Sequence, residues 1–318
     1  MAKLLITRPL PDSVCEAACA LAETTVREST APMSADEMLA ALADYDAILP
    51  TLGDAFSAEI FAQVKAPRAR LLANFGVGYN HIDAAAAKAA GITVTNTPGA
   101  VTDATADIAM TLILMSCRRA AEGERLVRSG RWAGWHPTQM LGLHVTGKTL
   151  GIVGMGRIGK AIARRGHDGF GMEVVFFNRS EVEDPGVPAT QMDSIERVAS
   201  AADVLVAAVP GSPATHHLIG AGVFVAMKPT AHLVNISRGD VVDEAALIAA
   251  LEARRIAGAG LDVYEFEPQV PEALRALDNV TLLPHLGTAA LEVREAMGHM
   301  ALDNIRAVLA GGTPPNAV

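Results

Sequence analysis

The chain has 318 residues, of which 50% are hydrophobic and 19% are charged, and its formal net charge is −9. This length exceeds that of a typical domain and the hydrophobic content can fill large cores, so we expect two folded lobes and no extensive disorder. The acidic balance provides no basic stripe to neutralise phosphates, which argues against a nucleic-acid partner.

The N-terminus and the cysteines indicate a cytoplasmic protein. Only three strongly apolar residues precede the first polar stretch, whereas a signal-peptide core needs about 7 or more. The most apolar helical pattern, around 108–115, stops at Arg118, well short of the roughly 20 residues of a membrane span. Cys15 and Cys19 are four residues apart on an expected helix, and we assign them to a buried face of it and not to a metal or redox pair.

Short apolar runs alternate with helical patterns over the first hundred residues. Strands are predicted at 3–7, 47–49, 71–74 and 93–96, with helices between them at, for example, 35–43 and 83–90. This alternation predicts a parallel sheet with helices on both faces. The pattern breaks near Pro98.

A second α/β series follows a long helical stretch that is predicted from 102 to about 129. Its six strands are expected at 150–153, 173–177, 204–208, 233–236, 258–262 and 280–282, before a last helix at about 289–309. Six such strands are typical of a complete doubly wound nucleotide-binding domain. Two similar lobes also predict a ligand cleft between them.

A glycine motif opens this second series. Gly154, Gly156 and Gly159 have G-x-G-x-x-G spacing, follow an apolar strand and begin an amphipathic helix. In this context the first glycine allows a tight turn, the second allows the backbone to approach a pyrophosphate, and the third allows close packing of helix and strand. The helix N-terminus adds N–H groups and a positive dipole. We therefore predict dinucleotide binding, the alternative being a purely structural turn.

Five ordered segments resemble the D-isomer-specific 2-hydroxyacid dehydrogenases. They are GVGYNHID at 76–83, TPGAVTDATAD at 97–107, NISRGDVVDEAAL at 235–247, GLDVYEFEP at 260–268 and PHLGTA at 284–289. The resemblance extends from about 71 to 290. It implies two doubly wound, Rossmann-like domains: a flavodoxin-like substrate domain at 1–98 and 290–318, and a dinucleotide-binding domain inserted at 99–289. The two crossings between them would be hinges for closure over substrate.

Three residues carry the chemistry that the resemblance implies. Arg238 would bind the substrate carboxylate and polarise the ketone, because its planar guanidinium can form paired hydrogen bonds with a carboxylate. His285 would protonate the carbonyl oxygen, since imidazole titrates near neutrality. Glu267 would orient His285 and raise its pKa. The alternatives are a surface arginine and a structural histidine.

Further binding residues are implied by the same resemblance. The backbone N–H groups of Val77 and Gly78 would bind the substrate carboxylate, although a plain turn is an alternative. Asp262, Thr105 and the carbonyl group of Ile236 would contact the nicotinamide. The remaining expected cofactor contacts are Arg157, Ile158, Val209, Pro210, Thr215, Arg238, His285 and Gly287, together with the three motif glycines.

The residues after the strand at 173–177 depart from the commonest family pattern. Asn178 lies 19 residues beyond Gly159, about where an NAD enzyme carries the acid that binds the ribose hydroxyls. Asparagine would not repel a 2′-phosphate, and Arg179 and Ser180 supply a cation and a hydroxyl group for it. We therefore expect NADPH to be preferred, with NAD possible if this loop is merely exposed.

These features favour a reductase of small 2-oxo acids, most similar to glyoxylate and hydroxypyruvate reductases. One alternative is a reductase of another 2-oxo acid, such as 2-ketogluconate. The other is a non-catalytic, nucleotide-sensing protein of the corepressor type. We expect no regulatory domain after Val318, which would argue against a feedback-controlled phosphoglycerate dehydrogenase.

A homodimer is expected through the 102–140 region, with burial inside one subunit as the alternative. Trp135 either shapes a neighbouring active site or is an ordinary hydrophobic anchor. No catalytic metal is predicted, and His216 and His217 are interpreted as a solvated loop pair.

Overall fold

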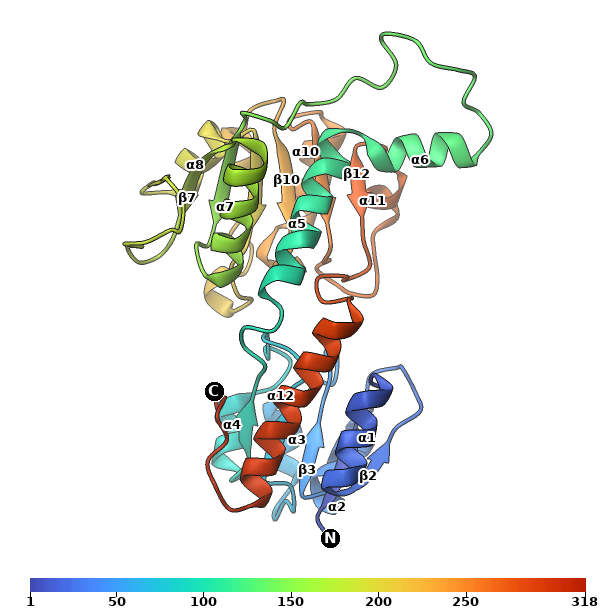
Figure 1. Cartoon of the computed structure of the whole chain (residues 1–318), viewed down its shortest axis with the longest axis vertical. Helices are drawn as coiled ribbons and strands as arrows, with labels where there is room; N and C mark the ends of the chain where they lie inside the picture. Colours follow the sequence, from blue (N-terminus) through green and yellow to red (C-terminus); the bar gives the residue numbers. More distant parts are fainter. The chain divides into compact units, whose positions relative to one another are not determined.

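The protein forms two compact units in a computed structural model that describes residues 1–318 (Figure 1). Unit 1 consists of residues 1–101 and 288–318, and unit 2 consists of residues 102–287. Each unit contains one sheet in which every pair of neighbouring strands is parallel. The fold is therefore α/β with two doubly wound sheets, as the sequence predicted.

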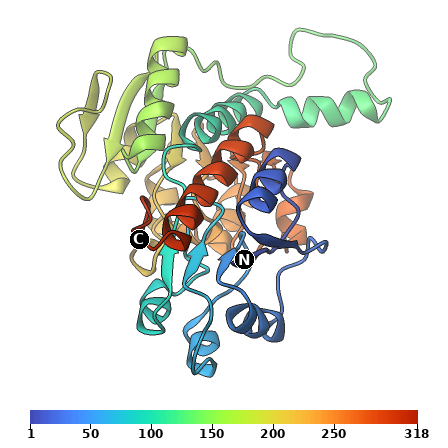
Figure 2. The same ribbon diagram turned by 60° about the horizontal axis from the view of Figure 1, so that its bottom comes forward.

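The sheet of unit 1 has the strand order β2-β1-β3-β4-β5. Its strands are β1 (Lys3–Ile6), β2 (Glu23–Val26), β3 (Ala47–Leu49), β4 (Leu71–Ala73) and β5 (Thr93–Thr95), and its helices are α1 (Asp12–Leu21), α2 (Ala35–Asp44), α3 (Ala58–Gln63), α4 (Ala84–Ala89) and α12 (Leu291–Leu309). Side chains alternate across the sheet. Leu4 and Ile6 face α1 and α12, which lie side by side in both views (Figures 1 and 2), whereas Leu5 faces α2 and α3.

The sheet of unit 2 has the order β12-β11-β10-β9-β6-β7-β8. Its strands are β6 (Thr149–Val153), β7 (Glu173–Phe177), β8 (Ala189–Gln191), β9 (Val204–Ala207), β10 (His232–Asn235), β11 (Gly258–Leu261) and β12 (Val280–Leu282). Helices α5 (Thr102–Cys117) and α7 (Arg157–Phe170) cover one face, and α8 (Ile195–Ala201), α9 (Ala221–Ala226) and α10 (Glu244–Glu252) cover the other. The strand order reverses direction between β6 and β9, which makes this pair the switch point where α/β sheets bind ligands.

Two strands and one helix break were not predicted. Strands β2 and β8 are short edge strands with mainly half-exposed or exposed residues, so they lack an apolar run. The predicted helix from 102 to 129 is divided into α5 and α6 (Ala120–Arg128), because Arg119 takes a left-handed conformation with φ 53°. Beyond the break, α6 and the following loop project from the rest of unit 2 (Figures 1 and 2).

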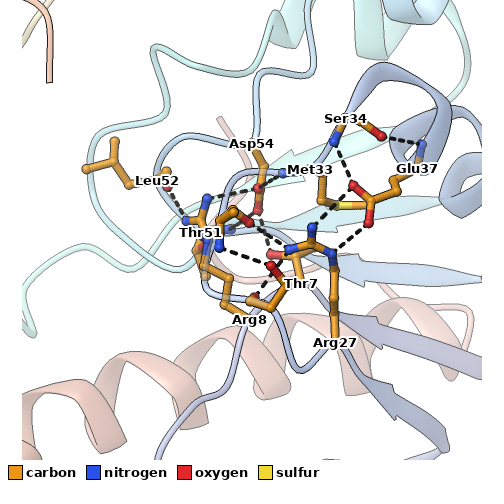
Figure 3. Close-up of polar contacts among 11 residues, drawn as sticks. Thr7, Arg8, Arg27, Met33, Ser34, Glu37, Thr51, Leu52 and Asp54 are labelled. Atoms are coloured by element: carbon orange, nitrogen blue, oxygen red, sulfur yellow. Dashed lines mark hydrogen bonds and ion pairs between the residues drawn. The ribbon is translucent and has the colours of Figure 1, made fainter. Parts of the chain in front are cut away.

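A buried carboxylate fixes the switch point of unit 1, at the carboxyl ends of β1 and β3 (Figure 3). Asp54 is fully buried and accepts hydrogen bonds from the Thr7 hydroxyl group (2.6 Å) and from the backbone N–H groups of Met33 and Thr51 (both 3.0 Å). Arg8 forms an ion pair with it at 3.2 Å. These partners offset the cost of burying the charge and hold the loop after β3 in place.

Two more predictions from the sequence, on membrane spans and on the cysteines of α1, can be compared with the helices of the structure. None of the helices combines the length and the apolar character that crossing a membrane requires. The assignment of both N-terminal cysteines to a buried face of α1 was wrong, because Cys19 is exposed and Cys15 is only partly buried. The residues of α1 that reach the core are Val14 and Ala18.

Candidate functional site

The glycine-rich turn lies between β6 and α7, at the carboxyl end of the unit 2 sheet. Gly154 has a φ of +101°, and a Cβ atom there would lie 2.7 Å from the carbonyl oxygen of Ala208. A Cβ atom at Gly159 would lie 2.1 Å from the carbonyl oxygen of Gly154, so only glycine permits this close packing. At Gly156, in contrast, a Cβ atom would meet nothing within 4 Å. These environments match the turn, packing and open-approach positions that the spacing predicts.

The first turn of α7 fits the phosphates of a dinucleotide. Gly156 is the N-cap, and no side chain caps the helix. Arg157 and Ile158 are the first helical residues, so their backbone N–H groups have no partner within the helix. Such N–H groups, together with the helix dipole, bind anions.

The segment 178–180 directly follows β7. Asn178 accepts a hydrogen bond from the backbone N–H of Met155 (3.3 Å), inside the glycine-rich turn, and its amide NH2 group donates to the carbonyl oxygen of Ser180 (3.0 Å). From β8, Gln191 also donates to that carbonyl oxygen (3.0 Å). Arg179 is exposed and forms no ion pair. A neutral amide therefore follows β7 directly, with an exposed cation next to it.

Arg238, Glu267 and His285 follow three neighbouring strands, β10, β11 and β12. Because the carboxyl ends of parallel strands share one edge, the fold brings these residues together although they span 48 positions. His285 Nδ1 lies 2.8 Å from Glu267 Oε2, and Glu267 Oε1 accepts from the backbone N–H of Tyr264 at 2.9 Å. With Nδ1 engaged, Nε2 is the ring nitrogen left to face a ligand.

Opposing effects set the charges of this group. Burial raises the pKa of Glu267, but the hydrogen bond and charge of His285 outweigh burial, so the pKa lies below its usual value. Burial lowers the pKa of Arg238, while the charge of Glu267 acts in the opposite direction. Arginine nevertheless stays cationic in proteins. The edge thus holds a cation, a carboxylate and an imidazole that can exchange a proton.

Asp262 anchors the segment that carries His285. Its two carboxylate oxygens accept from the backbone N–H groups of Leu286 (2.6 Å) and Gly287 (2.8 Å), and its carbonyl oxygen accepts from the N–H of His285 (2.9 Å). Burial raises the pKa of Asp262. Thr105 donates to the carbonyl oxygen of Gly287 at 3.2 Å. Thr105 and Asp262, two of the predicted nicotinamide contacts, therefore both bind Gly287, which was predicted as a further cofactor contact.

The other predicted contacts occupy two places. Val209, Pro210 and Thr215 lie in the loop after β9, where the N–H of Val209 donates to the hydroxyl oxygen of Ser237 (3.0 Å). Thr215 donates to the carbonyl oxygen of Pro210 (2.8 Å), and Ile236 is buried directly after β10. Val77 and Gly78 belong to unit 1, where they follow β4 and are half-buried.

One interaction beside the site was not predicted. His217 Nε2 lies 2.8 Å from Glu265 Oε1, a contact that the interpretation of His216 and His217 as a solvated loop pair did not include, although both residues are exposed. The Glu265 hydrogen bond raises the pKa of His217. Glu265 also accepts from the backbone N–H of Glu244 (3.3 Å). The sequence held no signal for the His217–Glu265 contact, because these two residues are 48 positions apart.

His216, His217 and Glu265 are also the one group with ligand atoms close enough for a metal, all within 4.8 Å of one another. The two imidazole rings are stacked, with centroids 3.9 Å apart and an interplanar angle of 24°. Nearly parallel rings direct their nitrogen lone pairs in nearly parallel planes, which suits a shared ion poorly. His217 is instead satisfied by Glu265.

Comparisons with a family model and with known proteins indicate one and the same family. Residues 110–287 match the family model described as D-isomer specific 2-hydroxyacid dehydrogenase, NAD binding domain. A glyoxylate reductase of Pyrococcus furiosus is 42% identical over 99% of this chain and 95% of its own length. A glycerate dehydrogenase of Hyphomicrobium methylovorum is 37% identical over 97% of this chain and 96% of its own.

A solved structure is similar over the whole chain. It is the NADPH-dependent glyoxylate/hydroxypyruvate reductase of Sinorhizobium meliloti, in complex with NADP and malonate. Its sequence is 37% identical and its TM-score is 0.88, with 100% of this chain and 96% of that chain covered.

Proposed function

Because the chain belongs to the D-isomer-specific 2-hydroxyacid dehydrogenases, we propose that it reduces a small 2-oxo acid, glyoxylate or hydroxypyruvate, with NADPH preferred. The observation that carries the proposal is the His285–Glu267 pair beside Arg238, at the edge where the glycine-rich turn also lies. When bound, the nicotinamide supplies a hydride to C2 of the acid. The protein must then bind the carboxylate, polarise the ketone and supply a proton.

His285 is the proton donor in this proposal. Nδ1 is held by Glu267, so Nε2 of the imidazolium would donate to the carbonyl oxygen as the hydride arrives at C2. The product is the 2-hydroxy acid, and the histidine is left neutral. Glu267 stays ionised because its pKa is lowered, and its hydrogen bond to Nδ1 holds the imidazole ring in place for the transfer.

Arg238 is the substrate cation. Its guanidinium would bind the carboxylate and stabilise negative charge on the ketone oxygen. The N–H groups of Val77 and Gly78 would bind the carboxylate as well. The same edge would bind the nicotinamide through Thr105, Ile236 and Asp262. The other cofactor contacts would be Gly154, Gly156, Arg157, Ile158, Gly159, Val209, Pro210, Thr215 and Gly287.

The proposed NADPH preference rests on 178–180. The Asn178 amide is neutral, Arg179 is an exposed cation, and the Ser180 hydroxyl group lies 3.2 Å from Asn178 Nδ2. A 2′-phosphate would gain charge-assisted hydrogen bonds from Arg179. The Sinorhizobium reductase, described as NADPH-dependent, supports this assignment.

We also propose a homodimer, now on different grounds from those of the sequence. The apolar residues of α5 pack inside unit 2, which explains their hydrophobicity without a partner. The projecting segment instead exposes Val127 (60%), Trp132 (50%), Trp135 (78%) and Leu141 (68%). Exposed apolar side chains gathered on one segment mark an interaction surface. Light scattering should give twice 33.1 kDa, and Trp135→Ala should shift the mass toward the monomer.

The function is tested by initial rates of nicotinamide oxidation with glyoxylate and with hydroxypyruvate, using NADPH and NADH at matched concentrations. Fast turnover with NADPH supports the whole proposal. Fast turnover with NADH alone would keep the reductase and overturn the cofactor preference. Inactivity with both acids and both cofactors would contradict the proposed substrates.

A further inference from the structure

The loop after β4 in unit 1 has an unusual hydrogen-bonding pattern. All three of its carbonyl groups, at Gly76, Val77 and Gly78, accept hydrogen bonds from within unit 1. The side-chain amide of Asn74 donates to the carbonyl oxygens of Gly76 (3.0 Å) and Gly78 (3.1 Å). The side-chain amide of Asn96, which follows β5, donates to that of Val77 (2.9 Å).

These bonds determine where the N–H groups point. In a trans peptide the C=O of one residue and the N–H of the next point in opposite directions. Fixing the carbonyl groups of residues 76–78 toward the asparagines therefore turns the N–H groups of Val77, Gly78 and Tyr79 the other way. No protein group accepts a hydrogen bond from these three N–H groups.

The two asparagines occupy defined places. Asn74 is 1% exposed, and one NH2 group serves two carbonyl oxygens, so both of its amide hydrogens are used. Asn96 is half-buried, and its backbone N–H donates to the carbonyl oxygen of Asn316 (3.2 Å), which ties it to the C-terminal segment. The backbone N–H of Thr97 donates a second hydrogen bond to the carbonyl oxygen of Gly76 (3.0 Å). The loop is thus fixed from two strands.

We propose that Asn74 and Asn96 are positioning residues that hold three N–H groups, those of Val77, Gly78 and Tyr79, in the orientation that binds the substrate carboxylate. This inference rests on the proposed function, and it adds a third donor and the two side chains that aim all three. Oriented successive N–H groups form an anion-binding concavity without a cation. Their alignment before binding saves the cost of ordering the loop with the substrate.

The first test is kinetic and uses Asn74→Ala and Asn96→Ala in the full-length protein. Asn74 donates two of these hydrogen bonds and Asn96 donates one, so KM for glyoxylate should rise roughly 5- to 150-fold in Asn74→Ala and roughly 2- to 13-fold in Asn96→Ala. Because neither residue contributes to the hydride or proton transfer, kcat and the Kd of NADPH should change less than about threefold.

A matched control separates positioning from stability. Asp46 precedes β3 at the opposite edge of the same sheet and accepts from the backbone N–H of Lys3 (2.7 Å) and from Arg68 (2.8 Å). Asp46→Ala should lower the thermal stability of the protein and leave KM unchanged. An equal rise in KM in this control would reduce the asparagines to a structural role and overturn the inference.

The second test does not depend on turnover. In ¹⁵N-labelled protein with NADPH, oxalate should shift the amide resonances of residues 77–79 in a saturable manner, with weaker affinity in Asn74→Ala. Amide shifts without turnover would contradict the proposed function and support the inference. Turnover with unmoved amides, or with an unchanged KM in both variants, would overturn the inference and leave the function standing.

Discussion

Two loops in this protein present backbone N–H groups at the carboxyl edge of a parallel sheet, and they do so by different means. In unit 2, Gly154 and Gly159 allow a turn so tight that α7 begins against the strand, and the helix aligns its N–H groups. In unit 1, no helix begins at residues 76–78, and side chains at positions 74 and 96 hold the carbonyl groups instead.

The difference shows how each solution depends on its surroundings. The three glycines of the turn lie close together in the sequence, at 154, 156 and 159, although Asn178 and Ala208 also contact the turn. The loop of unit 1 is assembled from two strands, so its geometry depends on the pairing of β4 with β5. The first solution suits a pyrophosphate, and the second suits one small carboxylate.

The largest effect is expected from changing the proton donor, which belongs to neither of the two loops. His285 has a φ of 55°, a left-handed value that asparagine tolerates better than alanine, so His285→Asn is the cleaner variant. Loss of the proton donor should lower kcat by about 10²- to 10⁴-fold, with the Kd of NADPH preserved. Single-turnover rates and NADPH fluorescence titration check this. Wild-type reduction of glyoxylate by the variant would exclude His285 as proton donor.

The next largest effect is expected from a substitution in the glycine turn. Gly159→Ala places a Cβ atom 2.1 Å from the carbonyl oxygen of Gly154, so the turn must shift, at a cost of about 1–3 kcal/mol. NADPH affinity should fall roughly 5- to 150-fold. Gly169→Ala on the same helix, where a Cβ atom meets nothing within 4 Å, is the control and should bind NADPH normally. Equal affinity in both variants would refute the packing argument.

A smaller effect concerns the choice of cofactor. Asn178→Asp introduces a carboxylate where a 2′-phosphate is proposed to bind, so the ratio of kcat/KM for NADPH to that for NADH should fall by about 10- to 50-fold. The complementary change, Arg179→Ala, should lower NADPH use alone. If neither variant altered the ratio, the 178–180 segment would have no part in the preference.

The smallest effect is a pH dependence of stability. The folded-state pKa of Glu267 is lowered, so the ionised group contributes stability that is present above its unfolded pKa and is lost as the pH falls through the folded value. Glu267→Gln should therefore reduce the free energy of unfolding by about 1 kcal/mol at pH 7. Urea titrations should show this difference closing below about pH 4. A difference that stayed constant from pH 7 to pH 3 would mean that the His285 bond does not stabilise the carboxylate.

The same contrast explains what the sequence could predict. The glycine turn, the central strands and the grouping of Arg238, Glu267 and His285 follow from local spacing, apolar runs and a resemblance carried by continuous segments. Asn74 and Asn96 were not predicted, because their role exists only once two strands pair. The His217–Glu265 contact was not predicted either, because it joins residues 48 positions apart. Strands β2 and β8 were missed because edge strands can be polar.

The most direct test of the account is the fate of the hydride. Hydroxypyruvate would be reduced with NADPH that carries deuterium at the transferred position of C4, and the glycerate would be analysed by mass spectrometry and chiral chromatography. The account predicts D-glycerate with one deuterium at C2. Formation of L-glycerate, or of glycerate without the label, would contradict it.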